Sequence, residues 1–285
     1  MPNNELGVLA GALKNKGLPE AYIINRLKEH LQLRILNHLY NQKSYNRKLI
    51  FTSGTCLRFC FDLPRLSEDL DFDYEGDLDA GEIGRVVARH LEESLQIKDI
   101  CCSVKGENRK IYLKFPVLEE LGLSFGGSRV LYLKIEPMPA PKAPASMEVS
   151  PISKEGFYFF IRRYSLPDLM AGKINAFLTR VFVKGSDSEG DFKGRDVFDL
   201  IWYMGRNIQP NWERLKILLA GTNYENRGWP GLLGDIEKKL KNTKKSHISG
   251  DIQYLIEDQN ALRAFLSNYP EIFRQYSRAS IAKHG

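Results

Sequence analysis

Residues 51–73 read FTSGTCLRFCFDLPRLSEDLDFD, and this stretch decides the fold that the sequence predicts. It opens on a turn of small residues, SGT (53–55), and closes on DLDFD (69–73). Acidic and bulky apolar residues alternate at the closing end, which predicts a strand with its carboxylates on one face. Like charges on one face repel, and acidic residues have poor strand propensity. We therefore expect a positive charge to balance these acids.

A divalent cation would supply that charge. Asp69 and Asp71 project from the same face of the predicted strand, and without a partner one of them would tend to stay protonated. Mg²⁺ (or Mn²⁺) prefers carboxylate oxygens together with substrate phosphates. Glu136 ends the best strand candidate in the chain, RVLYLKIE (129–136). If that strand lies beside residues 70–74, the three carboxylates could hold two metals about 3.5–4 Å apart. A lone Asp-x-Asp is also typical of a solvated strand edge.

The SGT turn adds a possible phosphate site upstream of the acids. KLIFT (48–52) predicts a short buried strand, and TCLRFCF predicts one or two helical turns. Ser53, Gly54 and Thr55 therefore lie at a strand-to-helix junction, where backbone N–H groups and the helix N-terminus favour anions. Arg58, in the helical turns that follow, is a further candidate for nucleotide binding. Turn and acids together predict a two-part triphosphate site.

The rest of the chain divides at a proline-rich segment, PMPAPKAPAS (137–146), which predicts an extended linker or surface crossover. An amphipathic helix is predicted over 19–42 and a hairpin over 99–115. After the linker we expect one strand, FYFFIRRYS, and then helices at 165–182, 195–206, 211–220, 231–241 and 251–267. The predicted fold is α+β, with a mixed-sheet core in residues 1–145 and a mainly helical domain in 146–285.

A second charged group lies in the predicted helical domain. Lys173 and Arg180 are two turns apart on one helix and so share a face. Asp196 and Asp199, on the next predicted helix, could pair with these cations or orient the lysine toward a phosphate. Two solvated cations on a surface helix are the alternative. The glycine-rich, charged stretch VKGSDSEGDFKG (183–194) predicts a mobile loop.

The bulk properties fit a soluble globular protein. The 285 residues carry a formal net charge of +6, with a pI near 9.0. This balance is compatible with a nucleotide or nucleic-acid partner, and a basic cluster at 238–245 could meet an RNA backbone. No apolar run is long enough to cross a bilayer, and no signal-peptide pattern opens the chain. The four cysteines form no CxxC, which argues against zinc and favours free buried thiols in a reducing cytoplasm. Walker A, GxSxG, HExxH and GxGxxG motifs are missing.

Taken in order, these motifs resemble those of the AbiEii/AbiGii toxin family. Its members are nucleotidyltransferase toxins of type IV toxin–antitoxin and phage-abortive systems, and they include the MenT toxins of mycobacteria. The resemblance rests on the Gly-Thr turn, RLSEDLDFD (65–73), K-x-x-A-x-x-x-R (173–180) and R-D-x-x-D-L (195–200). The combination is fairly specific, whereas each motif alone is not.

The resemblance implies a polymerase-β-like nucleotidyltransferase core followed by a helical domain. The implied chemistry is Mg²⁺-dependent transfer of a nucleoside monophosphate from an NTP. By motif matching, Asp69 and Asp71 would be metal ligands, Ser53 would contact phosphate, Lys173 would bind the triphosphate and Asp196 would be the catalytic acid of the second motif. Relatives act on tRNA 3′ ends, and some bind GTP. The resemblance therefore implies tRNA or another RNA as the acceptor and a cognate antitoxin with a DNA-binding domain as the partner.

Several alternatives stay open at this point. Asp73 extends the acidic series, so the metal pair could be Asp71 and Asp73, although Ser67-Glu-Asp69-Leu-Asp71 matches the SxDxD of the family. The family often has Gly-Gly or Gly-Ser where this chain has Ser53-Gly54-Thr55. A non-catalytic nucleotide or RNA-binding module, and a small-molecule nucleotidyltransferase of the antibiotic-modifying type, are the other functions compatible with these motifs.

Overall fold

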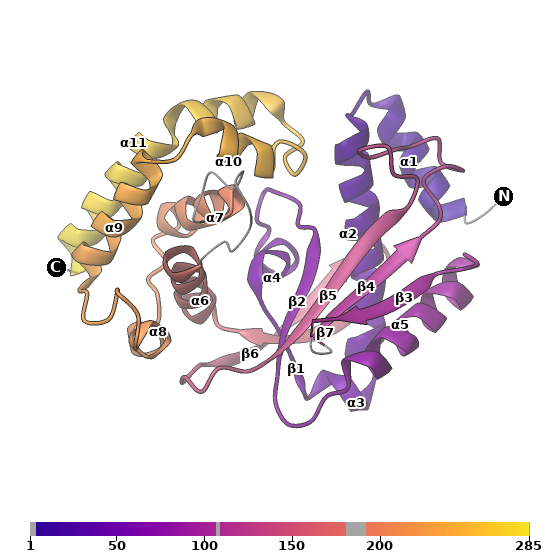
Figure 1. Cartoon of the computed structure of the whole chain (residues 1–285), viewed down its shortest axis with the longest axis horizontal. Coiled ribbons are helices and arrows are strands. Elements are labelled where there is room, and N and C mark those ends of the chain that lie inside the picture. The colour runs from indigo at the N-terminus through magenta and orange to yellow at the C-terminus, as the bar shows by residue number, and fades with distance from the viewer. Residues whose placement is uncertain (1–3, 107–108, 181–191, 285) are drawn as a thin grey trace. The chain divides into compact units, whose positions relative to one another are not determined.

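The computed structural model describes residues 4–106, 109–180 and 192–284 (Figure 1). The chain forms two compact units. The first comprises Met1–Ala140 and Glu148–Arg163, and the second comprises Pro141–Met147 and Tyr164–Gly285. Most of the loop predicted at 183–194 lies outside the described residues.

The first unit is built on a seven-stranded sheet with the order β3-β4-β5-β2-β1-β7-β6. The strands are β1 Leu49–Phe51, β2 Asp69–Tyr74, β3 Cys101–Lys105, β4 Lys110–Phe115, β5 Leu131–Pro139, β6 Met147–Lys154 and β7 Phe157–Tyr164. The sheet is mixed, because β2 runs parallel to β5 and β1 parallel to β7, while β1–β2, β3–β4 and β4–β5 are antiparallel. The predicted hairpin over 99–115 is confirmed as β3 and β4.

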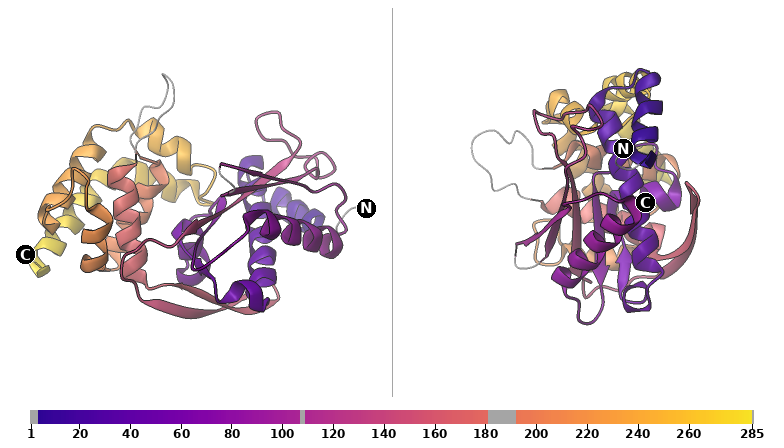
Figure 2. Two further views of the ribbon diagram at one scale, coloured as in Figure 1. Left: turned by 60° about the horizontal axis from the view of Figure 1, so that its bottom comes forward. Right: turned by 90° about the vertical axis from the view of Figure 1, so that its right-hand side faces the viewer.

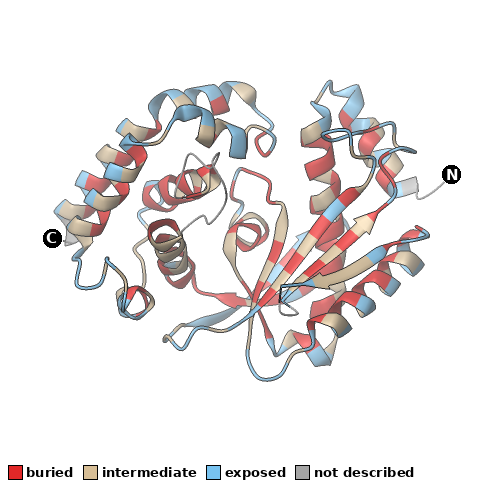
Figure 3. Cartoon of the chain, viewed as in Figure 1, coloured by how far each residue is buried: buried red, intermediate tan, exposed pale blue. Residues whose placement is uncertain are grey.

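One face of this sheet is apolar and covered by helices. Leu70, Phe72, Ile111 and Ile135 are almost fully buried, whereas the residues on either side of each of them in its strand keep partial exposure. Figure 3 shows this alternation of buried and partly exposed positions along the strands. Helices α2 (Glu20–Tyr40) and α5 (Ala80–Leu95) pack on β3–β5 and on each other. Because successive side chains of a strand point to opposite faces, the acids of β2 lie on the face away from this core.

The first unit contains five helices within the described residues. Besides α2 and α5 they are α1 Asn4–Asn15, α3 Lys43–Asn46 and α4 Ser53–Phe61. Asp79 caps α5 by accepting a hydrogen bond from the Gly81 N–H at 2.7 Å, and Gln96 ends the helix in the left-handed region. Helix α4 follows β1 directly, which confirms the predicted strand–turn–helix.

The second unit is a helical assembly, as the left view in Figure 2 shows. Its helices are α6 Leu166–Thr179, α7 Gly194–Gly205, α8 Trp212–Leu219, α9 Trp229–Lys241, α10 Lys245–Ile252 and α11 Gln259–His284. Ser165 caps α6 by accepting from the Asp168 N–H, and Pro167 lies in the first turn, as predicted. No described helix combines the length and apolarity that a membrane span requires.

The layout differs from the sequence-based prediction in several places. The helices α1, α3 and α5 were not predicted, and two strands, β6 and β7, follow the proline-rich segment where one was expected. A single helix was predicted over 251–267, but α10 ends at Ile252 and α11 begins at Gln259, because the Asp258 carboxylate accepts from the N–H groups of Asn260 and Ala261 and starts a new helix. The predicted boundary at 145 also differs from the observed units. Strands β6 and β7 complete the sheet and therefore belong to the first unit.

Candidate active site

The predicted site residues fall into two groups. One group lies in the first unit, around β1, β2, β5 and α4, and the other lies in the second unit, on α6 and α7. Each group is described within its own unit.

The first group centres on two neighbouring parallel strands. In the register of β2 and β5, Asp69 is opposite Lys134 and Asp71 is opposite Glu136. This pairing confirms that the RVLYLKIE strand lies beside the Asp-x-Asp strand. Asp69, Asp71 and Glu136 consequently share the sheet face that carries no apolar core, where Asp69 and Glu136 keep about a fifth of their side-chain surface exposed.

A lysine that the sequence analysis did not single out lies among these acids. The Lys134 ammonium is 3.1 Å from Asp69 Oδ2 and 2.7 Å from Glu136 Oε2. Burial alone would lower the pKa of Lys134, but the two carboxylates outweigh it and raise that pKa above its ordinary value. Lys134 therefore supplies a positive charge that the acidic strand requires. Its position two residues before Glu136 in the same strand was the available signal, since residues i and i+2 share a face.

The donor set of this group suits a hard divalent cation. Asp69, Asp71 and Glu136 offer carboxylate oxygens on one face of adjacent strands, which is the ligand chemistry Mg²⁺ and Mn²⁺ prefer. No group of three acidic, cysteine or histidine side chains within the described ranges is already drawn together as a metal cage. Lys134 occupies the space between two of the acids, so a bound cation and its ammonium compete for the same carboxylate oxygens.

The turn at residues 53–55 is anchored to the acidic strand. The Thr52 N–H donates to the Asp71 carbonyl at 3.2 Å, which places the start of α4 beside the acids. Ser53 has φ +62°, a left-handed conformation that is uncommon for a residue other than glycine. Such backbone strain persists where the surroundings enforce it, and it clusters at functional sites.

The three predicted turn residues have different surroundings. Ser53 keeps partial exposure, whereas Gly54 and Thr55 are buried. The Thr55 hydroxyl is 2.8 Å from Ser67 Oγ and also donates to the Asp69 carbonyl. A Cβ on Gly54 would lie 2.6 Å from the guanidinium of buried Arg65. Thr55 and Gly54 thus hold α4 against the acidic strand.

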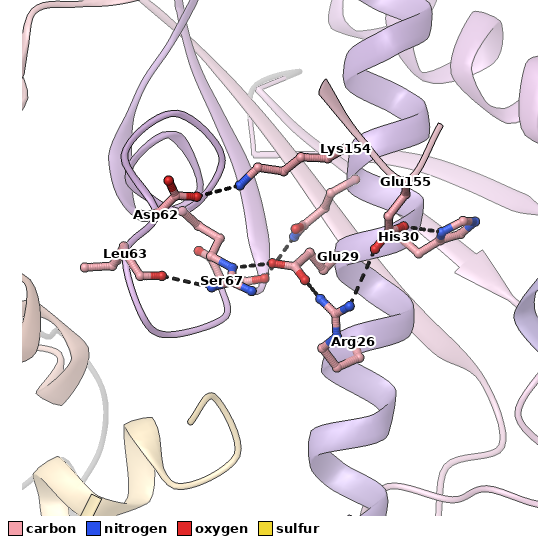
Figure 4. Close-up of polar contacts among 10 residues, drawn as sticks. Arg26, Glu29, His30, Asp62, Leu63, Ser67, Lys154 and Glu155 are labelled. Atoms are coloured by element: carbon pink, nitrogen blue, oxygen red, sulfur yellow. Dashed lines mark hydrogen bonds and ion pairs between the residues drawn. The ribbon is translucent and has the colours of Figure 1, made fainter. Parts of the chain in front are cut away.

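Arg58 lies one turn further along α4 and joins a network of charges. Its guanidinium is 2.5 Å from Glu29 Oε1 of α2 and donates to the Leu63 carbonyl at 3.1 Å. Figure 4 shows how Glu29 also meets Arg26, which reaches Glu155 beside His30. The structure therefore brings Arg58 to a protein carboxylate, and its predicted nucleotide contact stays a prediction.

The second group is a buried cluster of ion pairs. The Lys173 ammonium lies 2.8 Å from Asp196 Oδ1 and 2.8 Å from Asp199 Oδ2, and both aspartates are at most 2% exposed. Arg180, at the C-terminal cap of α6, is 2.5 Å from Asp196 Oδ2. Of the two possibilities that the sequence offers for the aspartates, the structure shows the ion pairing: Lys173 meets both of them and Arg180 meets Asp196. Arg180 lies just outside α6, which ends at Thr179 and not at residue 182 as predicted. The alternative of two solvated cations is excluded for Lys173, which is 11% exposed.

These cations decide the ionisation of Asp196. Burial alone would raise the pKa of its carboxyl group, but Lys173 and Arg180 outweigh burial and hold that pKa well below its usual range. Asp196 is therefore ionised at neutral pH. It balances the charge of the lysine and fixes its orientation.

Two other predictions concern residues outside both groups. In the basic cluster at 238–245, Lys239 donates to the Phe177 and Leu178 carbonyls and Lys241 pairs with Glu237, so part of this cluster serves the helical packing. All four cysteines are free, as expected, but only Cys56 is fully buried and Cys101 is exposed.

A mixed sheet whose Asp-x-Asp strand lies beside a strained strand-to-helix turn is the architecture of a nucleotidyltransferase core. The family model for the nucleotidyl transferase AbiEii toxin of type IV toxin–antitoxin systems matches residues 34–274 of the chain. The chain belongs to this family, and the predicted enzyme class is confirmed.

Two solved structures are similar to the chain over most of its length. MenT4, a nucleotidyltransferase toxin from Mycobacterium tuberculosis H37Rv, is 17% identical with a TM-score of 0.52, over 95% of this chain and 91% of that one. JHP933 from Helicobacter pylori is 16% identical with a TM-score of 0.49, over 91% of this chain and 94% of that one. A comparison with curated protein sequences finds no match. The likeness to MenT4 confirms the predicted α+β nucleotidyltransferase fold.

Proposed function

We propose that this toxin transfers a nucleoside monophosphate from an NTP to an RNA acceptor, most simply a tRNA, in a reaction that requires Mg²⁺ or Mn²⁺. The observation that carries the proposal is the register of β2 and β5, in which Asp71 faces Glu136, with Asp69 two residues away and the turn before α4 bonded to Asp71. The three carboxylates and the turn at residues 53–55 are therefore neighbours in the first unit.

The proposed roles follow from the chemistry of each group. Asp69, Asp71 and Glu136 hold the metal, which when bound would neutralise charge on the reacting phosphates. The backbone N–H groups at Ser53 and Gly54 bind phosphate at the start of α4. Lys173 and Arg180 bind the triphosphate of the donor as cations, and Asp196 orients Lys173. Thr55 and Arg58 belong to the nucleotide site through α4, which they hold in place.

The reaction is a substitution at phosphorus. An acceptor hydroxyl oxygen forms a bond to the α-phosphorus of the NTP while the bond from that phosphorus to the oxygen bridging to the β-phosphorus breaks. Pyrophosphate leaves, and the hydroxyl proton passes to a carboxylate or to water. Positioning and charge stabilisation account for most catalysis of this kind.

The central test compares the wild type with three variants, and each protein is incubated with a labelled NTP, Mg²⁺ and total tRNA. Asp69→Asn, Asp71→Asn and Asp73→Asn differ only in which acid of β2 loses its charge. We expect the first two to lower the transfer rate at least about 100-fold, because metal stabilisation is worth several kcal/mol, and the third to retain most activity. Equal losses at Asp71 and Asp73, with Asp69→Asn active, would move the metal pair to 71/73.

Removal of the metal, and the identity of the acceptor that becomes labelled, distinguish the proposed function from its alternatives. EDTA should abolish transfer, and added Mg²⁺ or Mn²⁺ should restore it. Label transfer to no RNA, protein or small molecule would contradict the proposal, and NTP binding that is indifferent to metal and to Asp71→Asn would favour a binding module. Label on an aminoglycoside-like small molecule instead of RNA would favour a small-molecule nucleotidyltransferase.

The family context extends the proposal to a partner and a setting. We infer that a cognate antitoxin with a DNA-binding domain restrains the toxin in the cytoplasm, where NTPs and tRNA are available. Expression of the chain alone should then arrest growth, and Asp71→Asn should not. Growth arrest by Asp71→Asn at equal protein levels would separate toxicity from nucleotidyl transfer.

A further inference from the structure

The polar face of the sheet extends from the acids of β2 and β5 onto β3 and β4, where its side chains include lysines and a tyrosine instead of acids. In the register of β3, β4 and β5, Tyr112 is opposite Ser103 and Lys134, and Lys114 is opposite Tyr132. Lys105 is opposite Lys110, whose ammonium approaches Glu136 at 3.5 Å. The face therefore changes from carboxylates on β2 to lysines and tyrosines on β3–β5. We call its members Lys105, Lys110, Tyr112, Lys114 and Tyr132 the tyrosine–lysine face.

Both aromatic rings of this face have a lysine ammonium over them, and Tyr132 is exposed whereas Tyr112 is partly exposed. Tyr132 is 46% exposed, although the residues on either side of it in β5 are buried. Lys114 Nζ lies 5.7 Å from the ring centroid of Tyr132, and Lys105 Nζ lies 5.7 Å from that of Tyr112. Each ring is thus paired with an ammonium group, which holds the ring in place and leaves a positive charge beside an apolar surface.

This combination selects its ligand by chemistry. Exposed aromatic rings bind nucleobases by stacking. Lysines on neighbouring strands of the sheet bind the phosphates that link those nucleobases. A base-paired duplex does not offer its base faces to such rings, whereas a single strand does. An acidic protein partner would use the lysines but would leave the tyrosine rings without a role.

The tyrosine–lysine face also leads directly to the acids. Asp71, Glu136, Lys110 and Lys105 lie on one line across β2, β5, β4 and β3. Three interstrand steps make that line about 14 Å long. A strand whose terminal hydroxyl lies at the acids would pass over β5, β4 and β3 with its preceding nucleotides.

We propose that the tyrosine–lysine face binds the acceptor as single-stranded RNA, with bases stacked on Tyr132 and Tyr112 and phosphates paired with Lys105, Lys110 and Lys114. The inference rests on the proposed function, because it assigns the surface that delivers the acceptor to Asp69 and Asp71. It also divides the sheet into a catalytic part at β2 and an acceptor-binding part at β3–β5.

Binding is tested without catalysis, on the full chain carrying Asp71→Asn and in the absence of NTP. The probe is a fluorescent single-stranded RNA of about twelve nucleotides, and its anisotropy gives Kd at several salt concentrations. Tyr112→Ala/Tyr132→Ala should raise Kd at least about tenfold, since stacking of each base contributes measurably. Lys105→Gln/Lys110→Gln/Lys114→Gln should reduce the slope of log K against log salt by about 2, at about 0.7 for each phosphate.

Matched controls come from exposed residues elsewhere in the chain. Tyr158→Ala removes an aromatic side chain that is 64% exposed on β7, and Lys16→Gln/Lys98→Gln/Lys142→Gln removes three exposed charges. Both should leave Kd within about twofold of the parent, and Tyr132→Phe, which keeps the ring, should do the same. Circular dichroism and thermal melting establish that each variant is folded. A folded double-tyrosine variant with unchanged Kd overturns the inference.

The outcomes separate this inference from the proposed function. Transfer to RNA by the wild type, with the same acceptor KM in the double-tyrosine variant, refutes the tyrosine–lysine face and keeps the enzyme. Binding of the oligonucleotide through this face, without any transfer by the wild type, keeps the face and refutes the enzyme. A variant that loses affinity for NTP but not for RNA assigns the face to the donor and overturns the inference.

Discussion

Gly54 shows how the absence of a side chain allows two segments of the chain to pack closely. It is buried at the start of α4, and an added Cβ would lie 2.6 Å from the guanidinium of Arg65, which is itself 2% exposed. That guanidinium donates to the Leu66 carbonyl at 2.8 Å and cannot move without losing this bond. Glycine at this position therefore lets the turn pack closely against the segment that leads into the acids.

We expect Gly54→Ala to lower the free energy of unfolding by about 1–3 kcal/mol, since it overpacks a buried site. Denaturant titration followed by circular dichroism measures the change. Gly234→Ala is the control, because Gly234 lies exposed in α9 with nothing near its Cβ position. That change should be neutral or stabilise by up to about 1 kcal/mol. A Gly54→Ala protein as stable as Gly234→Ala would mean that Arg65 yields easily.

Asp196 carries a buried charge on which the ion pairs between α6 and α7 depend. Its pKa is depressed in the folded chain, so its ion pairs with Lys173 and Arg180 stabilise the protein above the unfolded pKa of about 3.9 and lose that contribution as the pH falls further. Asp196→Asn should cost about 1–3 kcal/mol at pH 7, because it removes the buried carboxylate that Lys173 and the partly exposed Arg180 share, while Lys173 keeps Asp199.

The measurement is the unfolding free energy of wild type and Asp196→Asn between pH 7 and pH 3. Their difference should be constant from about pH 7 to 5 and should shrink below about pH 4, as the wild-type carboxylate begins to protonate in the unfolded chain. Glu257→Gln serves as a control for an acid at an exposed position. A difference that grows toward low pH would contradict the assigned direction of the pKa shift.

The two faces of β5 have different surroundings, because one packs against the helices and the other is partly exposed. Ile135 is fully buried against the helices, whereas Tyr132 is 46% exposed on the opposite face. Ile135→Ala should therefore destabilise the chain by about 2–5 kcal/mol, and Tyr132→Ala by less than about 1 kcal/mol. Denaturant unfolding of both variants checks this. Equal losses would mean that Tyr132 supports the fold and would weaken its assignment as a binding residue.

The sequence predicts β2 and β5 well, because alternation with a period of two survives in both strands. It also predicts α6, where Ser165 and Pro167 mark the start. It does not reveal the role of Lys134, since the pairing of β2 with β5 decides which acids that lysine meets, and register is a long-range property. The break between α10 and α11 was missed because the apolar spacing continues across it, whereas the Asp258 cap overrides it.

For the whole molecule, the α+β class and the separation into a sheet unit and a helical unit are readable from composition and periodicity. The boundary is not, because the proline-rich segment resembles a linker although the chain returns after it to the first sheet. Strand β7 pairs with β1 at Phe51↔Arg163, and the Tyr40 hydroxyl donates to the Arg162 carbonyl at 3.0 Å. Contacts so distant in sequence leave no local pattern by which they could be recognised.

This arrangement predicts how truncated chains behave. A fragment of residues 1–145 lacks both β6 and β7, so β1 becomes an edge strand and Phe51, which is fully buried in the whole chain, lies at that edge. A fragment of residues 1–163 keeps nearly the whole sheet. We expect the longer fragment to unfold cooperatively in urea and the shorter one to aggregate or to lack a transition, as size-exclusion chromatography and circular dichroism would reveal. Cooperative unfolding of the 1–145 fragment would show that β1–β5 are sufficient for folding and that β6 and β7 are not required.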